Sequence, residues 1–404
     1  MISEKIREDF PVLQNNKGLV YFDNAATSLK PIQVIEAVNH YYKNLGANVH
    51  RGNHHLSQQT TQLYEESRKE VAKFIGAKEE ELAFTRNATE SINAICVGLE
   101  RQGYFSKGDE IIISALEHHA NIVPWQELCK RTGAVLKIAE LNDDFTINMQ
   151  DLEEKVTGKT KLVSVAHASN TVATILPVKE IGKIAHDNGA LFLVDAAQSV
   201  PHFDVNAKKI DADFLAISSH KMLGPTGVGA LYGKKDLLEK MPPYNYGGSM
   251  ISKVSYEKTE WAPLPEKFEA GTMPIAEVIG FGEAVKYLKK IGMENVHNHE
   301  KKLLSHALKK MQEIERIKLF CPQDVEKQGG IILFEVKGID AVDLGVALDE
   351  SKNIATRSGM HCAEPIVSSL NPKGLGRASF YLYNTIDEID TFVDEVTAIS
   401  HAFK

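Results

Sequence analysis

The feature that most constrains the fold of this chain is a regular alternation of short apolar runs with helix-length segments after about residue 80. The runs "EIIIS", "LVSVA" and "LFLV" are continuously apolar, which is typical of strands buried on both faces of a sheet. Residues 161–167, 178–189 and 191–197 are expected to form strand, helix and strand, a unit that joins parallel strands by a right-handed crossover. The alternation therefore predicts an α/β fold with a mainly parallel sheet.

The C-terminal part of the chain has a different pattern. The strand-like runs "GGIILFEVKG" and "RASFYLY" flank one helical segment and precede a terminal helix that begins near Thr385. We therefore expect a large domain over residues 20–285 and a small α+β C-terminal domain over residues 286–404, with residues 1–19 packing against the small domain. A length of 404 residues suits two domains.

Charge and composition exclude several classes of partner. The net charge of -8 argues against nucleic acid and anionic membranes, because both select a basic protein face. No apolar segment approaches the roughly 20 residues that span a bilayer, and the N-terminus "MISEKIREDF" lacks the apolar core of a secretory signal. The four cysteines are scattered, which favours free thiols in a reducing compartment. We therefore expect a cytoplasmic protein with no nucleic-acid or membrane partner.

Polar side chains follow the predicted strands at the points where the strands end. In an open parallel sheet, ligands bind outside the carboxyl ends of the strands, so these side chains are expected to converge at one edge. Lys221 lies in "SSHKMLGPTGVG", whose glycines are expected to let the backbone approach a ligand closely. The candidate residues at the strand ends are Thr89, His118, Asn170, Asp195, Gln198, Ser218, His220 and Lys221.

Together these residue types suit pyridoxal 5′-phosphate. The helix start at Thr89 offers N–H donors to a phosphate, Asp195 can keep a ring nitrogen protonated, and His118 can stack on an aromatic ring. A desolvated lysine forms a Schiff base with an aldehyde, which is the role expected of Lys221. Taken singly, each residue has an ordinary explanation, such as a strand-end turn for Asp195. The prediction therefore depends on their occurrence together.

The histidines raise the alternative of a metal site. His54-His55 and His118-His119 are adjacent pairs, and adjacent residues on a helix or strand point apart. The cysteines form no C-x-x-C pair. We therefore expect no metal centre at the residues that could supply one, which are His50, His54, His55, His118, His119, His361 and Cys362.

A second set of candidates lies near the C-terminus, in "ATRSGMHCAEP" and "GRASF". Cys362 sits between Gly359 and Glu364-Pro365, which favours an exposed loop over a packed strand. The nearby Arg357 and Arg377 would favour the thiolate form of a cysteine and could also clamp the carboxylate of an amino acid. The other cysteines, by contrast, are expected to be packing residues: Cys96, Cys129 and Cys321.

The order of these motifs resembles the class V aminotransferases, and within them the Suf-type cysteine desulfurases and selenocysteine lyases. The matching segments run in order through "NATESIN", "EHHANIVPW", "SN", "VDAAQ", "SSHKMLGPTGVG", "FEAGT", "SGMHCAEP" and "RASF", and the likeness extends from Val20 to the last helix. The resemblance implies the type I pyridoxal-phosphate fold, with the active site at the interface of a homodimer. At Ala173 the chain departs from the family pattern, where a glycine is usual.

The resemblance also implies a role for each matching residue. Lys221 would bind the aldehyde of the cofactor, Asp195 its pyridine nitrogen, and Cys362 would carry a persulfide. The other implied cofactor contacts are Gln198 as donor to the ring hydroxyl, His118 stacked on the ring, Asn170 beside the cofactor, Thr89, Ser218 and His220 at the phosphate, and Thr272 at the phosphate of the partner subunit. The implied substrate-binding residues are Arg377 at the carboxylate and, near it, Arg357, His50 and Arg51.

The implied activity is conversion of L-cysteine to L-alanine, with the persulfide sulfur passed to a Suf-type acceptor or scaffold protein for iron-sulfur cluster assembly. In this mechanism Lys221 takes the α-proton and the Cys362 thiolate attacks the substrate sulfur. One alternative is a selenocysteine lyase, and another is a lyase or transaminase of the same fold, which would need no thiol at Cys362. A third is a catalytically silent scaffold or carrier-binding module.

Overall fold

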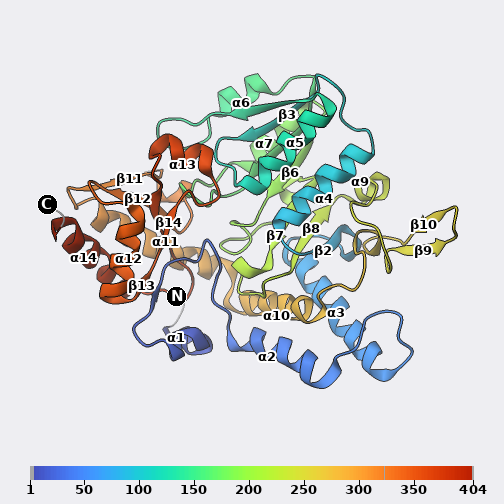
Figure 1. Cartoon of the computed structure of the whole chain (residues 1–404), viewed down its shortest axis with the longest axis horizontal. Helices are drawn as coiled ribbons and strands as arrows, with labels where there is room; N and C mark the ends of the chain where they lie inside the picture. The colour runs from blue at the N-terminus through green and yellow to red at the C-terminus, as the bar shows by residue number, and fades with distance from the viewer. Residues whose placement is uncertain (1–3, 323, 403–404) are drawn as a thin grey trace.

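The larger part of the molecule is built on a seven-stranded sheet (Figure 1). The computed structural model describes residues 4–322 and 324–402, and within them the strands of this sheet lie in the order β2, β8, β7, β6, β5, β3 and β4. Neighbours from β4 to β7 are parallel, while β8 is antiparallel to both β7 and β2. The sheet is therefore mainly parallel, as predicted. Its strands are β2 (Leu82–Thr85), β3 (Glu110–Ser114), β4 (Val135–Ala139), β5 (Thr160–Ala166), β6 (Leu191–Asp195), β7 (Phe214–Ser218) and β8 (Gly229–Gly233).

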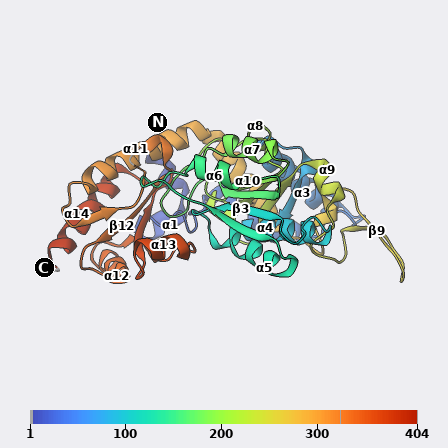
Figure 2. The same ribbon diagram turned by 90° about the horizontal axis from the view of Figure 1, so that it is seen from above.

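Helices cover both faces of this sheet, which explains the uninterrupted apolar runs. Along β3, Ile112 packs into one core cluster while Ile111 and Ile113 pack into a second cluster on the opposite face. Figure 2 shows α4 and α5 on one side of the sheet and α7, α8 and α10 on the other. The helices are α2 (Ile32–His40), α3 (His55–Phe74), α4 (Ala88–Arg101), α5 (Val123–Thr132), α7 (Val178–Asp187), α8 (Ala207–Ile210) and α10 (Ile275–Ile291).

The C-terminal part contains a separate, antiparallel four-stranded sheet. Its strand order is β11, β12, β15 and β14, and helices α11, α12 and α14 contribute to the core packed against it. The elements are α11 (Met293–Met311), β11 (Ile317–Leu319), β12 (Ile331–Val336), α12 (Ala341–Lys352), β14 (Arg357–Gly359), α13 (Glu364–Leu370), β15 (Leu375–Ser379) and α14 (Ile386–Ala402). The domain boundary expected after residue 285 falls inside α10, which continues to Ile291.

The N-terminal segment lies against the C-terminal part. Strand β1 (Val20–Tyr21) pairs in parallel with β13 (Ile354–Ala355). Arg7 donates from Nη1 to the Tyr383 carbonyl at 2.6 Å, and the rings of Phe10 and Tyr383 are 4.6 Å apart. The C-terminal part thus packs against the start of the chain, and residues 20–27 lie at the junction of the two sheets.

The remaining elements are short. The hairpin of β9 (Ile251–Val254) and β10 (Thr259–Trp261) projects from the molecule at the end far from the C-terminus (Figure 1). No helix in the described residues is long and apolar enough to cross a membrane. The other elements are the α-helices α1 (Pro11–Asn15), α6 (Met149–Lys155) and α9 (Lys235–Lys240), the π-helix η2 (Tyr41–Leu45), and the 3-10 helices η1 (Glu4–Asp9), η3 (Glu79–Glu81), η4 (His119–Asn121), η5 (Ser219–Lys221), η6 (Glu266–Phe268) and η7 (Val325–Lys327).

Candidate active site

A cavity of about 230 Å³ lies at the carboxyl edge of the parallel strands, where the C-terminal part closes over it. It gathers thirteen polar side chains from the two parts of the molecule. Eleven of them were singled out from the sequence for the cofactor or the substrate, or as the thiol; His361 was named only as a possible metal ligand, and Asn87 is the helix cap of α4. The polar lining consists of Asn87, Thr89, His118, Asn170, Asp195, Gln198, Ser218, His220, Lys221, Arg357, His361, Cys362 and Arg377.

Lys221 ends the 3-10 turn η5 that follows the buried strand β7. Burial lowers the pKa of its amine from 10.5 to about 8, and the positive charges of Arg377 and Arg357 act in the same direction. The carboxylate of Asp195 opposes this shift. A substantial fraction of the amine is therefore neutral near physiological pH, the form that reacts with an aldehyde or accepts a proton.

The turn that carries Lys221 is held from the N-terminal segment. The carbonyl of His220 accepts hydrogen bonds from the Ser28 amide at 3.0 Å, the Thr27 hydroxyl at 3.0 Å and the Lys30 amine at 2.9 Å. Burial lowers the pKa of Lys30 to about 7. Sequence reasoning missed these three residues; the only signal was their place just after the predicted start of the large domain.

Asp195 ends β6 and Gln198 follows it, and the two side chains leave two oxygen atoms available to a ligand. The Oδ1 atom of Asp195 accepts the Ala197 amide at 3.0 Å, and burial raises the pKa of the carboxyl group. The side-chain nitrogen of Gln198 donates to the Ala25 carbonyl at 2.8 Å. The buried Gln198 Oε1 has no hydrogen-bond partner among the described residues. A buried acceptor without a donor is costly, so this position favours a bound group that donates to it.

The start of α4 supplies the anion-binding end of the cavity. Asn87 caps the helix by accepting the Glu90 amide, and the Ser218 hydroxyl accepts the Ala88 amide at 2.9 Å. Thr89, in the first turn, is exposed to the cavity. Gly229 serves this packing: a Cβ there would lie 2.7 Å from the Asn87 Cα. At this position the glycine makes room for protein backbone, where the sequence suggested room for a ligand.

His118 offers a neutral aromatic ring to the cavity. Its Nδ1 accepts the Ala120 amide at 3.0 Å, so the ring proton resides on Nε2. Burial, followed by the charge of Lys221, lowers the pKa of His118 to about 3. Behind it, Glu117 is fully buried among the Ser114 hydroxyl, the Asn121 amide and the backbone of β5, and burial raises its pKa to about 7.

The Cys362 thiol is exposed at the edge of the same cavity, on the loop between β14 and α13. His361 and Cys362 both adopt left-handed backbone conformations, with φ of 51° and 56°. Residues from the seven-stranded part contact this loop. Asn170 donates to the His361 carbonyl at 2.7 Å, and the His119 amide donates to the Cys362 carbonyl at 2.7 Å. The His119 Nε2 also accepts the Glu364 amide at 2.9 Å.

Arg377 and Arg357 stand opposite each other on β15 and β14 and share one carboxylate. Asp23 lies 3.1 Å from the Nη2 of Arg377 and 3.5 Å from the Nη1 of Arg357. Arg377 also donates to the Asn170 carbonyl at 2.8 Å, while its buried Nε has no partner within the described ranges. Sequence reasoning missed Asp23, which follows the short strand β1 in "VYFDNAAT".

Three predicted residues lie elsewhere in the chain. His50, Arg51 and Thr272 line a second cavity of about 200 Å³, together with Ser249 and Glu266. The His50 Nε2 is 2.8 Å from the Glu65 carboxylate, and this hydrogen bond raises the pKa of His50. Within one chain, the structure thus separates these three residues from Lys221 and Cys362.

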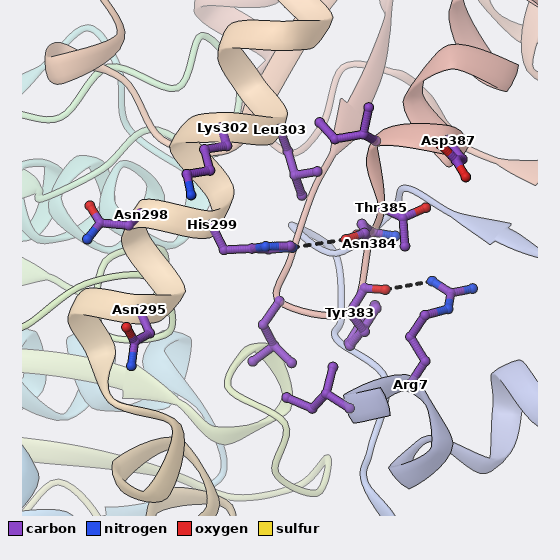
Figure 3. Close-up of a pocket in the computed structure, with 13 residues that line it drawn as sticks. Arg7, Asn295, Asn298, His299, Lys302, Leu303, Tyr383, Asn384, Thr385 and Asp387 are labelled. Atoms are coloured by element: carbon purple, nitrogen blue, oxygen red, sulfur yellow. Dashed lines mark hydrogen bonds between the residues drawn. The ribbon is translucent and has the colours of Figure 1, made fainter. Parts of the chain in front are cut away.

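A larger cavity of about 320 Å³ contains none of the predicted residues. Figure 3 shows it between α11, which carries Asn295, Asn298 and His299, and the segment of Tyr383 to Asp387 before and into α14. The His299 ring bonds to the Asn384 carbonyl at 2.9 Å. Across the part of the chain that the structure describes, no group of three or more His, Cys, Asp or Glu side chains is arranged to hold a metal ion.

Comparison with known proteins gives a consistent result for nearly the whole chain. The family model described as aminotransferase class-V matches residues 20–392. A cysteine desulfurase of Haloferax volcanii is 44% identical over 99% of this chain and 97% of that protein. A probable cysteine desulfurase of Halalkalibacterium halodurans is 45% identical over 96% of both chains.

Solved structures show the same likeness. The apo structure of a cysteine desulfurase from Thermococcus onnurineus superposes with a TM-score of 0.95 at 41% identity, covering 100% of this chain and 99% of that one. The cysteine desulfurase CsdA from Escherichia coli, in an S-sulfonic acid form, superposes with a TM-score of 0.92 at 34% identity over 100% of this chain and 99% of that one. The cavity therefore lies in a fold that these desulfurases share.

Proposed function

This chain belongs to the class V aminotransferase family and, within it, to the cysteine desulfurases, and on that premise we propose that it converts L-cysteine to L-alanine and retains the sulfur as a persulfide on Cys362. The observation that carries the proposal is the presence of two reactive groups at one cavity: the Lys221 amine, with its lowered pKa, and the exposed Cys362 thiol. Removal of the α-proton of an amino acid needs the amine, and removal of its sulfur needs the thiol.

The residues of this cavity fit pyridoxal 5′-phosphate. Lys221 suits its aldehyde, the carboxylate of Asp195 its ring nitrogen and the neutral ring of His118 its aromatic face. The unpartnered Gln198 Oε1 is placed to accept from a ring hydroxyl, whereas the sequence resemblance implied a donor there. The phosphate end is served by the first turn of α4 and by the side chains of Thr89, Ser218 and His220.

When bound, pyridoxal 5′-phosphate supplies an electron sink that makes the Cα–H bond of the substrate acidic. Arg377, with Arg357 beside it, binds the substrate carboxylate. The neutral Lys221 Nζ removes the α-proton, and the Cys362 sulfur attacks the substrate sulfur. The substrate Cβ–S bond breaks as an S–S bond forms. Cβ then gains a proton and Cα regains the one it lost, so that one cysteine yields one alanine and one enzyme persulfide.

Replacing Cys362 by serine tests the proposal. The Cys362→Ser variant should keep the cofactor absorbance, because Lys221, Asp195 and the start of α4 are unchanged. It should form neither persulfide nor alanine from L-cysteine, as measured by alkylation mass spectrometry and amino-acid analysis. Cys129→Ser, at a partly buried thiol outside the cavity, is the matched control and should retain both products. Undiminished alanine from the Cys362→Ser variant would overturn the desulfurase mechanism.

We further propose that the second cavity completes the active site of the partner subunit in a homodimer. This assignment explains why His50, Arg51 and Thr272 lie together yet apart from Lys221. Mixed dimers of Lys221→Ala and Thr272→Ala chains test it. If Thr272 acts across the interface, one of the two sites in each mixed dimer is intact. An equal mixture, of which about half is mixed dimer, then recovers up to about a quarter of the wild-type activity although each variant alone is defective. No recovery would mean that Thr272 acts within its own chain.

The exposure of Cys362 supports a protein acceptor for the sulfur. We propose a Suf-type acceptor or scaffold protein that serves iron-sulfur cluster assembly in the cytoplasm, where thiols stay reduced. The test is loss of labelled sulfur from the Cys362 persulfide when purified candidate acceptors are added, with small thiols as the comparison. Discharge by small thiols at the same rate as by every candidate protein would contradict a dedicated acceptor.

A further inference from the structure

We propose that His119 is a positioning residue that holds the Cys362 loop against the cavity and thereby sets where the thiol lies. The inference rests on the proposed function only in giving Cys362 a chemical role. His119 is not part of the cavity lining. Two of its hydrogen bonds are with the loop: its amide donates to the Cys362 carbonyl at 2.7 Å, and its Nε2 accepts the Glu364 amide at 2.9 Å.

These two hydrogen bonds hold the loop backbone directly after the thiol. One binds the carbonyl of Cys362 itself, and the other binds an amide two residues later, at the first residue of α13. His119 opens the 3-10 turn η4 after β3, so its position is set by the seven-stranded sheet. One residue of the seven-stranded part thus bonds at two points to the backbone of a loop that belongs to the other part of the molecule.

The conformation of the loop explains why it needs such support. His361 and Cys362 have φ of 51° and 56°, a region that L-residues with side chains adopt at a cost. Such conformations persist where the surroundings hold them. At the base of the loop, a Cβ on Gly374 would lie 2.7 Å from the Gly359 Cα, which shows how closely β14 and β15 converge there. Above that base, His119 and Asn170 form hydrogen bonds to the loop from the seven-stranded part.

The adjacent histidines His118 and His119 therefore have different roles. His118 lines the cavity, and its Nδ1 is bonded to the Ala120 amide. His119 turns to the loop, and the two ring centroids are 6.3 Å apart. Because both residues belong to one short turn, the ring offered to the cofactor and the support of the thiol are fixed by the same backbone. The sequence showed only that adjacent residues point apart.

The chemistry of the His119 ring suggests a matched pair of variants. Its Nε2 accepts a hydrogen bond, so the ring is neutral with its proton on Nδ1. Glutamine can present a carbonyl oxygen at a similar reach and accept the same Glu364 amide. Leucine fills a similar volume and accepts nothing. Ser369→Ala serves as a control, since the Ser369 hydroxyl bonds only within α13, to the Ile366 carbonyl.

The experiment compares the cofactor-loaded wild-type enzyme with His119→Leu, His119→Gln and Ser369→Ala. Hydrogen exchange of peptides covering residues 360–366 should be about tenfold faster in His119→Leu, because a backbone hydrogen bond to the ring is lost. The rate of Cys362 alkylation by iodoacetamide should change, and persulfide formation should slow about tenfold with the KM for cysteine little altered. His119→Gln should recover most of each effect, Ser369→Ala should match the wild type, and the cofactor absorbance should be the same in all four proteins.

Unchanged exchange and alkylation in His119→Leu would overturn the positioning role, whatever the activity. Equal loss in His119→Gln and His119→Leu would also overturn it, because the acceptor atom would then be irrelevant. If the wild type itself gave no alanine or persulfide, the proposed function would fail, while the exchange measurement would still decide whether His119 holds the loop.

Discussion

Two parts of the cavity differ in how they are built. One is the wall around Lys221, formed by the strand ends of the seven-stranded sheet and the start of α4; the other is the loop around Cys362, between β14 and α13. Lys221 follows a buried strand inside a seven-stranded sheet, and donors from three residues fix the peptide before it. Cys362 follows a three-residue strand at the edge of a four-stranded sheet, is exposed, and has a left-handed backbone. Under the proposed function, this difference reflects the different needs of the two reactions. Proton transfer by an amine needs desolvation, whereas delivery of sulfur to another molecule needs access.

The largest expected effect comes from removing the amine. Lys221→Ala should lower alanine and persulfide formation on the order of a thousandfold or more, because no other lysine among the described residues lines the cavity to remove the α-proton. The alkylation rate of Cys362 should stay close to that of the wild type, since the loop is held by other residues. Product analysis measures the loss of alanine and persulfide, and iodoacetamide labelling measures the alkylation rate of Cys362. If Cys362 alkylation also collapsed, the wall and the loop would not be separate units.

The packing of the wall can be tested without touching the chemistry. Gly229→Ala places a Cβ within 2.4 Å of the Ile217 carbonyl oxygen and 2.7 Å of the Asn87 Cα. Both contacts are with backbone, so the substitution should reduce the free energy of unfolding by about 1–3 kcal/mol. The control is Gly158→Ala, where a Cβ would meet nothing within 4 Å. Thermal denaturation of both variants measures the difference in stability. Equal melting temperatures would show that the start of α4 can shift to accommodate the added Cβ.

The electrostatics of the wall predict how Lys221 titrates. In the cofactor-free protein, acylation of Lys221 should rise with pH around a midpoint of about 8, because burial lowers the pKa from 10.5 and only the neutral amine reacts. Asp195→Asn removes a charge that raises this pKa, so the midpoint should fall further. Mass spectrometry of the labelled peptide at several pH values gives both curves. A midpoint near that of surface lysines would mean that the amine is not desolvated.

The sequence predicted the wall better than the supports of the loop, for a physical reason. Asp195, Ser218 and Lys221 could be located because they follow buried strands, and the ends of parallel strands meet at one edge of a sheet. Asp23 and His119 act on segments far along the chain, through contacts that depend on how the two sheets pack. Neither residue type nor spacing encodes such contacts. Thr272 was placed by resemblance alone, and one chain does not bring it to Lys221.

The smallest expected effect concerns the turn that carries Asn170, the residue that bonds to the His361 carbonyl. Ala173 in this turn has a φ of 65°, a region that favours glycine. Ala173→Gly should therefore raise the free energy of unfolding by roughly 0.5–1 kcal/mol, since relief of strain exceeds the entropy cost of glycine. Ala37→Gly, inside α2, should instead lower it by roughly 0.5–1 kcal/mol. Suppose that denaturation confirms the sign of both changes in unfolding free energy and that the Cys362 alkylation rate is unchanged. The strain at Ala173 then belongs to the wall and does not position the loop. A changed alkylation rate would instead place this turn, with His119, among the supports of the thiol.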